Sequence, residues 1–312
     1  MLKKTIIGNL GNQMFQYAAL RGMQAKYYPN EEIELSFTAV NFRTGERITK
    51  PNWLEHFALR PYRVAEEIRP VGIQRLVSGA LGYYIQKQWD TDDIATCRNI
   101  QHDIEVKFQP LLNRFGLYQM QDGYCDWAKC NVKDKHFTGY FESEQYFAHI
   151  GEEIRKEFTP IQPPRPENEE LYRRMAETNS VCISIRRGDF VGTEIDGYAN
   201  LCGPAYFKAA MEKMKELVPD CVFFFFSDDI DWVREQNFTQ DTCHYERGDD
   251  PVWEKLRLMS CCKHFIISNS SFSWWAQYLS VFSEKQVIAP DQWRRNSPRP
   301  DIYLPGWTLL PV

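Results

Sequence analysis

The 312-residue sequence lacks long apolar runs, a regular cysteine pattern and any excess of basic residues. Its longest apolar run, residues 221–226, is far shorter than the roughly 18 residues of a membrane-spanning helix. The apolar stretch near the N-terminus is too short for a signal peptide. The 9 cysteines are scattered and form no C-x-x-C motif, which argues against a disulfide framework or a zinc site. We therefore expect a reduced, cytoplasmic protein without a transmembrane segment, while peripheral association with a membrane stays open.

The charge balance also excludes one class of partner. Lys and Arg number 37 against 42 Asp and Glu, so the net charge is −5. Proteins that bind nucleic acid usually present a basic face, and we expect no nucleic-acid partner here. An anionic ligand would have to be held by local positive charge.

The length predicts about two domains, and one segment is suited to join them. Four prolines fall within residues 160–166, where they are incompatible with a helix or a central strand. We therefore place the boundary after residue 160. Beyond it, apolar strands expected at residues 181–185, 221–226, 264–268 and 286–289 alternate with helices. This alternation predicts an α/β fold with a parallel sheet.

In such sheets, ligands bind beyond the carboxyl ends of the strands. Arg186 and Arg187 directly follow one predicted strand. Two guanidinium groups suit a diphosphate because each can bind two phosphate oxygens. The alternative is an exposed pair of arginines in surface ion pairs.

A serine-rich segment follows another predicted strand: Ser268, Asn269, Ser270 and Ser271. The free N–H groups of the helix that begins there would attract an anion. The simpler interpretation is helix capping. Together with the arginine pair, this segment could neutralise a nucleotide diphosphate without a metal.

Asp228 and Asp229 follow the strand at residues 221–226. With Asp231 they resemble the Asp-x-Asp motif that binds manganese in another class of nucleotide-sugar transferases. We favour the alternative, in which one carboxylate caps the next helix or accepts a hydrogen bond from a ribose.

The N-terminal turn contains Gly8, Asn9, Gly11, Asn12 and Gln13. It matches neither a dinucleotide-binding glycine motif nor a P-loop. The glycines would let the backbone approach a substrate, and the amide side chains would bind its hydroxyl groups. A tight strand-to-helix turn without a ligand is the alternative. We expect this turn to share one cleft with the three strand ends above.

At these positions the sequence resembles the bacterial, soluble α-1,2-fucosyltransferases of glycosyltransferase family 11. The matching segments run in the family's order along nearly the whole chain: residues 8–17, 139–147, 185–190, 226–229, 268–276 and 290–307. One position departs from the family pattern, because Ser184 stands where the family usually has His.

The resemblance implies a GT-B fold with two facing Rossmann-like domains. Residues 1–160 would form the acceptor side, with residues 291–312 packed back on it, and residues 161–290 would bind GDP-fucose. It further implies transfer of fucose with inversion to the 2-hydroxyl of a terminal galactose, without a metal.

In this reading Arg186 holds the β-phosphate, and Arg187 either assists it or anchors the loop. The general base is Asp189 or Glu194; the latter lies at the spacing of the base in related α-1,6-fucosyltransferases. Two other functions stay open. One is a metal-dependent transferase that uses Asp229 and Asp231, and the other is a glycan-binding protein without enzymatic activity.

Overall fold

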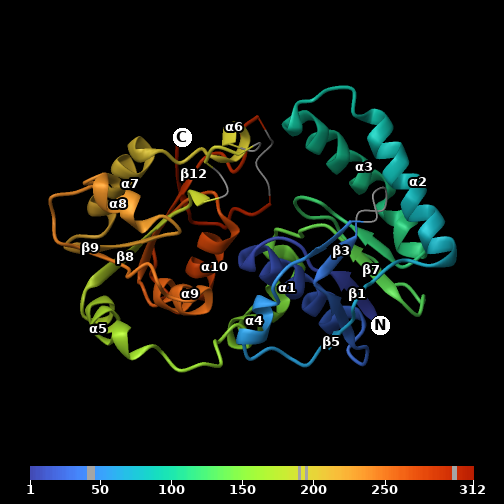
Figure 1. The fold of residues 1–312 in the computed structure, drawn as a ribbon, viewed down its shortest axis with the longest axis horizontal. Coiled ribbons are helices and arrows are strands. Elements are labelled where there is room, and N and C mark those ends of the chain that lie inside the picture. The colour runs from blue at the N-terminus through green and yellow to red at the C-terminus, as the bar shows by residue number, and fades with distance from the viewer. Residues whose placement is uncertain (41–45, 189–190, 194–195, 297–300) are drawn as a thin grey trace. The chain divides into compact units, whose positions relative to one another are not determined.

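The computed structural model describes residues 1–40, 46–188, 191–193, 196–296 and 301–312 (Figure 1). The chain divides into two compact units. Unit 1 comprises residues 1–157 together with 301–302, and unit 2 comprises the remaining described residues. The division lies three residues before the boundary expected from the prolines.

Unit 1 is built around a five-stranded parallel sheet of order β5-β2-β1-β7-β6, with β3 and β4 forming a separate antiparallel pair. Its elements are β1 (Leu2–Thr5), α1 (Leu10–Tyr27), β2 (Ile33–Ser36), β3 (Thr38–Val40), β4 (Arg47–Thr49), β5 (Arg63–Val64), α2 (Gly72–Gln88), α3 (Ile94–Arg114), β6 (Leu117–Gln119), β7 (Lys135–Thr138) and α4 (Gly151–Glu157).

Unit 2 is built around a six-stranded sheet of order β10-β9-β8-β11-β12-β13, in which every pairing is parallel. Figure 1 shows α7 and α8 on one side of this sheet and α9 and α10 on the other. Its elements are α5 (Glu169–Glu177), β8 (Asn179–Ile185), α6 (Asp196–Ala199), α7 (Pro204–Leu217), β9 (Cys221–Ser227), α8 (Ile230–Glu235), β10 (Cys243–Tyr245), α9 (Val252–Ser260), β11 (His264–Ile267), α10 (Ser271–Leu279), β12 (Val287–Pro290) and β13 (Thr308–Leu310).

The core of unit 2 follows from two sequence patterns. The phenylalanines of β9 are at most 1% exposed, because a parallel sheet covered on both faces buries every strand position. Helix α7 begins at Pro204, whose fixed φ suits a first helical turn. Phe207, Met211 and Met214 then lie on one face of the helix and join the cluster that contains Ile183 of β8. Each such buried side chain contributes about 1.5–3 kcal/mol to folding.

The prediction that residues 291–312 pack back on the first domain is wrong for most of the described segment. Strand β13 extends the second sheet, with Thr308 paired to Ile288 and Leu309 to Ala289 of β12. The physical reason is that the outer edge of β12 presents backbone groups that need partners, and β13 supplies them. Only the described residues 301–302 group with unit 1, where Asp301 accepts a hydrogen bond from the N–H of Tyr124 at 3.0 Å.

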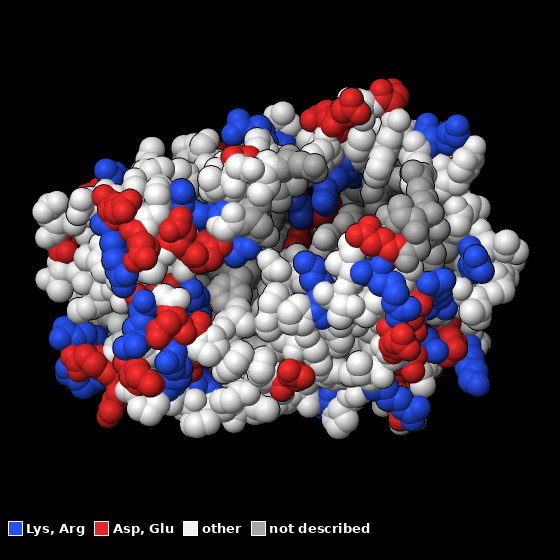
Figure 2. Space-filling model, in the orientation of Figure 1, with Lys and Arg blue, Asp and Glu red and all other residues white. Residues whose placement is uncertain are grey.

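Figure 2 shows groups of Lys, Arg, Asp and Glu side chains, mixed in sign, among larger areas of other residues. Many form pairs within one helix, such as Arg173 with Glu170 and Glu177 on α5. Exposed pairs of this kind contribute little to stability. No helix in the described parts of the chain is both long enough and apolar enough to cross a membrane.

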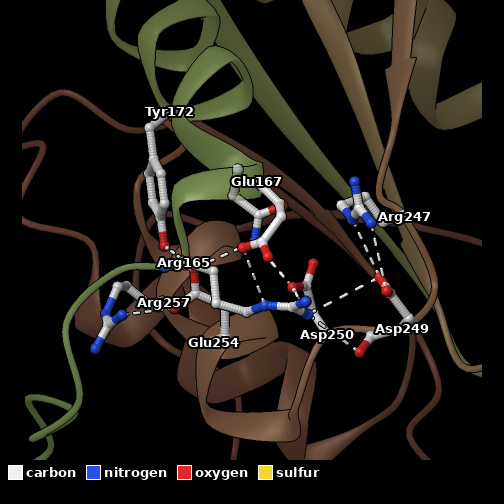
Figure 3. Close-up of polar contacts among 9 residues, drawn as sticks. Arg165, Glu167, Tyr172, Arg247, Asp249, Asp250, Glu254 and Arg257 are labelled. Atoms are coloured by element: carbon white, nitrogen blue, oxygen red, sulfur yellow. Dashed lines mark hydrogen bonds and ion pairs between the residues drawn. The ribbon is translucent and has the colours of Figure 1, made fainter.

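The proline-rich segment is fastened to α9 of unit 2 (Figure 3). Arg165 pairs with the buried Asp250 at 2.8 Å, and its N–H donates to Glu254 at 3.0 Å. Tyr172 also donates to Glu254, at 2.9 Å, while Arg257 donates to backbone oxygens of the segment. Because buried carboxylates require such partners, these bonds tie the start of unit 2 to its interior.

Candidate active site

Three of the predicted ligand-binding segments lie at one edge of the second sheet. Strands β8, β9 and β11 are parallel neighbours, with Ile185 paired to Ser227 and Ser184 paired to Ile267. Their carboxyl ends are therefore level, and the residues that follow them emerge side by side. The fourth predicted segment, the turn after β1, belongs to unit 1.

Arg186 and Asp228 form the centre of this edge. The Arg186 Nη1 atom lies 2.6 Å from Asp228 Oδ2, and about a quarter of each side chain is exposed. The other oxygen of Asp228 accepts the N–H of Arg187 at 2.9 Å. A side chain at Gly188 would collide with Asp228, so glycine leaves room for the pair. One carboxylate thus positions both arginines.

Arg187 has two side-chain partners next to this pair. Its Nε atom donates to Asp229 at 3.0 Å, and its guanidinium lies 3.6 Å from the centroid of the Trp232 ring. Stacking on an aromatic face stabilises a guanidinium. These two contacts join Arg187 to the turn after β9 and to α8, and its role in phosphate binding stays a prediction.

Two aspartates after β9 have local partners: Asp229 caps the next helix, and Asp231 forms a surface ion pair. Asp229 Oδ1 accepts the N–H of Trp232 at 3.3 Å, which caps α8. Asp231 is exposed and pairs with Arg234 at 2.8 Å. The capping interpretation is therefore confirmed for Asp229. Over the described ranges, no three His, Cys, Asp or Glu side chains gather as metal ligands would.

The serine-rich segment after β11 divides into two parts. Asn269 is buried and donates to the backbone oxygens of Ala199 at 2.7 Å and of Trp293 at 2.9 Å, so it ties neighbouring loops together. Ser268 lies 3.2 Å from the hydroxyl of Ser273. Ser270 is the N-cap residue of α10, and Ser271 is its first residue. The N-terminal end of α10 therefore presents backbone N–H groups beside the carboxyl end of β11, and such groups can bind an anion.

Ser184 occupies the position where the family usually has histidine. Its hydroxyl lies 2.6 Å from that of Ser273, and the residue is 6% exposed. The hydroxyl therefore bonds to α10, and the pair joins β8 to the helix whose N-terminus borders the site.

A buried ion pair that the sequence did not indicate supports the turn after β9. Glu246 Oε1 accepts the N–H of Ser227 at 2.6 Å, and Lys255 donates to the oxygen of Ser227 at 2.7 Å. Lys255 and Glu246 are 2.9 Å apart. Burial raises the pKa of Glu246, and Lys255 opposes the shift. The only signal in the sequence was a glutamate directly after a short strand, which is too common to be informative.

The turn after β1 is held by amides. Strand β1 ends at Thr5, three residues before Gly8. Gly8 has φ +79°, and a side chain there would collide with Asn12. Gln13 is fully buried and donates to the backbone oxygens of Gly8 at 3.3 Å and Pro51 at 3.0 Å. It acts here as a structural tie, which differs from the substrate contact expected from the sequence.

The other predicted substrate contacts lie near the start of α1. Asn9 is exposed and is the N-cap residue, Asn12 is half-buried, and Gly11 is buried. The two candidate bases, Asp189 and Glu194, lie outside the described residues. Between them, the N–H of Gly192 donates to Asp196 at 2.7 Å.

Known proteins resemble this chain in sequence and in fold. An α-1,2-colitosyltransferase from Escherichia coli is 36% identical over 296 residues, covering 92% of this chain and 90% of its own length. Galactoside α-(1,2)-fucosyltransferase 1 from Alouatta caraya is 26% identical over 214 residues, covering 60% of this chain and 58% of its own.

A crystal structure of the NodZ α-1,6-fucosyltransferase soaked with GDP-fucose aligns with a TM-score of 0.50 and 12% identity over 96% of each chain. This likeness and the two parallel sheets confirm the predicted α/β fold of the GT-B type. The sequence model of glycosyl transferase family 11 matches residues 103–311. This match covers more than half of the sequence, and the chain belongs to glycosyltransferase family 11.

Proposed function

We propose that the protein transfers L-fucose from GDP-β-L-fucose to the 2-hydroxyl of a terminal galactose, with inversion and without a metal. The observation that carries the proposal is the position of Arg186 in a family 11 chain. It stands at the carboxyl end of β8, next to Asp228 and level with the segment that leads to α10.

In the proposed complex, the diphosphate takes the place of Asp228 beside Arg186. A guanidinium can exchange one anion for another while remaining ionised. The N–H groups at the start of α10 would bind a second group of phosphate oxygens. Arg187 would keep its contacts with Asp229 and Trp232 and hold the loop. These groups would stabilise the negative charge that develops on the departing GDP, because they are already in position.

The proposed reaction is a direct displacement. The 2-hydroxyl oxygen of galactose attacks C1 of fucose, and the bond between C1 and the β-phosphate oxygen breaks. GDP leaves with the electron pair, and the hydroxyl proton passes to Asp189 or Glu194. General-base assistance of this kind accelerates a reaction by about 10²–10⁴-fold. On the acceptor side, Asn9 and Asn12 are proposed to bind sugar hydroxyls beside the backbone of Gly11.

The decisive experiment incubates the protein with GDP-fucose and a panel of galactosides, with and without EDTA, and determines the product linkage by NMR. The proposal predicts an α-1,2 linkage and no loss of rate in EDTA. Loss of activity that is restored by manganese would support the metal-dependent alternative with Asp229 and Asp231. A protein that binds oligosaccharide but whose melting temperature does not rise in saturating GDP would be a glycan-binding protein instead.

The base can be identified by comparing Asp189→Asn with Glu194→Gln. The variant that removes the base is expected to lose about 10²–10⁴-fold in kcat, while its GDP-induced melting shift remains. If both variants retain near-wild-type turnover, neither residue is the base.

One observation favours a second candidate, transfer of colitose, because the 36% identical relative is a colitosyltransferase. Colitose lacks the 3-hydroxyl of fucose. A site that hydrogen-bonds this hydroxyl would reject the analogue strongly, whereas an apolar site would discriminate weakly. The ratio of kcat/KM for GDP-fucose and GDP-colitose separates the two candidates.

A further inference from the structure

The side chain of Asn269 joins three chain segments at the carboxyl end of β11. Its Nδ2 atom donates to the backbone oxygen of Ala199, at the end of α6, at 2.7 Å, and to that of Trp293, in the segment after β12, at 2.9 Å. Its Oδ1 atom accepts the thiol of Cys202, just before α7, at 3.5 Å. Asn269 is only 5% exposed, so its amide depends on these protein partners for its hydrogen bonds.

Helix α6 follows the loop that contains both candidate bases. The loop begins after Arg187 and includes Asp189 and Glu194, and Glu194 is two residues before the first residue of α6. A general base must lie within hydrogen-bond reach of the proton that it removes. The position of α6 therefore limits where the base can stand, and the contacts that fix α6 contribute to its placement.

Hydrogen bonds join the described part of this loop to the helix. Asp196, the first residue of α6, accepts the N–H of Gly192 at 2.7 Å and the side-chain amide of Asn200 at 2.9 Å. At the other end of the loop, the N–H of Val191 donates to the oxygen of Arg187 at 3.0 Å. The loop is therefore tied to the arginine pair at one end and to α6 at the other.

Helix α6 depends on such external bonds because it is short and poorly buried. Of its four residues, all of them described, only Ala199 is buried, and a helix of this length is not stable by itself. The segment after β12, which Figure 1 draws next to α6, supplies one more bond: the N–H of Arg295 donates to the oxygen of Tyr198 at 3.0 Å. Since apolar packing holds α6 weakly, the amide of Asn269 has a large share in its position.

We propose that Asn269 is a positioning residue, which fixes α6 and thereby the loop of the general base beside the end of β11. This inference rests on the proposed function, because a general base acts only in the transfer reaction. Asn269 directly precedes Ser270, the N-cap residue of α10, whose N–H groups are proposed to bind the diphosphate. One short segment thus serves the donor through its backbone and the loop of the base through its side chain.

The kinetic test compares Asn269→Asp and Asn269→Ala with the wild-type protein, using GDP-fucose and a galactoside acceptor. Aspartate keeps the shape of asparagine but turns oxygens toward two backbone oxygens, and alanine removes all three contacts. Both variants should lose about 10- to 100-fold in kcat, the cost of a small misplacement. The KM for GDP-fucose and the melting shift in GDP should stay within about twofold of wild type. Because a displaced base no longer sets the rate, the rise of kcat with pH should become shallower.

The matched control is Asn179→Ala, at the opposite end of β8. The amide of Asn179 also donates to a backbone oxygen, that of Pro219 at 3.0 Å, and its loss should leave the kinetics unchanged. Cys202→Ala removes only a weak thiol donor and should lower kcat by less than about threefold. Hydrogen exchange tests the placement without any substrate: the amides of residues 196–200 should exchange about tenfold faster in Asn269→Ala, while those of β8 and β9 keep their rates.

Three results would overturn the proposal. The first is wild-type kcat in both Asn269 variants, and the second is an equal loss of kcat and of GDP affinity, which would make Asn269 part of the donor site. The third is unchanged hydrogen exchange at residues 196–200. If the wild-type protein transfers no fucose to any galactoside, the proposed function fails, whereas the exchange measurement still decides whether Asn269 fixes α6.

Discussion

The two units place different chemistry at equivalent points of a similar topology. In unit 1 the turn after β1 is held by uncharged amides: Gln16 pairs with both the N–H and the oxygen of Ile7, at 3.1 and 2.7 Å, and Gln13 donates to Gly8. In unit 2 the turns after β8 and β9 are held by ion pairs, such as Arg186 with Asp228. Neutral groups suit a sugar with many hydroxyls, whereas guanidinium groups suit a diphosphate.

The difference also concerns how each turn would respond to damage. An amide tie contributes about 1 kcal/mol, whereas a buried ion pair that loses one partner leaves an uncompensated charge. We therefore expect substitutions in the ion pairs at the turns of unit 2 to impair function or folding strongly, and substitutions in the turn after β1 of unit 1 to act more mildly.

Among the tests of this comparison, the largest effect is expected for Arg186→Lys. Lysine keeps the charge but loses the forked geometry, so kcat with GDP-fucose should fall about 10²–10³-fold, the cost of removing one donor to a developing anion. Initial-rate kinetics measures it. Arg173→Lys, on the exposed face of α5, is the matched control and should keep full activity. Near-wild-type turnover by Arg186→Lys would contradict the assignment of unit 2 to the diphosphate.

The second prediction concerns the ion pair beneath the same turn. Glu246→Gln should lower the free energy of unfolding by about 3 kcal/mol, because Lys255, whose side chain is only 15% exposed, would lose its carboxylate partner. Urea unfolding measures it. Adding Lys255→Met should restore part of the loss, since a buried pair replaced by apolar groups is tolerated better than a broken one. Glu212→Gln, in a surface pair of α7, should leave stability unchanged. An equal loss of stability in Glu246→Gln and Glu212→Gln would contradict the distinction between the pair beneath the turn and a surface pair.

The difference between the units also explains which helices and strands could be predicted from the sequence. The apolar runs of β8 and β9 are buried on both faces, so their composition alone identifies them as strands of a parallel sheet. Their order then placed Arg186 and Asp228 at one edge. By contrast, α2 and α3 in unit 1 were not predicted. Helix α2 has apolar residues on opposite faces and so lacks a clear amphipathic period, and α3 contains Pro110.

Side-chain partners were harder to predict than elements. The pairing of Asp228 with Arg186 joins residues 42 positions apart, and Glu246 meets Ser227 only because β10 lies beside β9. Gln13 was expected to contact substrate. It is buried, however, and donates a hydrogen bond to the backbone oxygen of Pro51, which belongs to a later loop. Such contacts depend on tertiary packing, which no local pattern encodes.

The third prediction tests the milder response of unit 1. Gly8→Ala should lower the free energy of unfolding by about 1–2 kcal/mol, because alanine is strained at φ +79° and its methyl group would push against Asn12. Gly79→Ala in α2 is the control, since nothing lies within 4 Å of the added carbon, and it should stabilise the protein by about 0.5–1 kcal/mol. A destabilised Gly79→Ala protein, or an unaffected Gly8→Ala protein, would contradict this account.

The smallest effect compares one buried histidine from each sheet. Burial is the main cause that lowers the pKa of His136, on β7, to about 4, and it also lowers the pKa of His264, on β11. An unfolded histidine binds its proton near pH 6.5. For His136 the unfolded state therefore takes up more protons between pH 6.5 and 4, and stability falls as the pH drops through this window.

For His136 we expect a loss of about 1 kcal/mol by pH 5, after allowance for solvent screening. Urea unfolding at pH 7, 6 and 5 measures this loss, and His136→Gln should reduce the slope. His264→Gln provides the comparison in unit 2, where the ring nitrogen Nδ1 accepts the N–H of Gln286 at 3.1 Å and protonation would remove that bond. An unchanged slope in His136→Gln would mean that another group controls the acid sensitivity of unit 1.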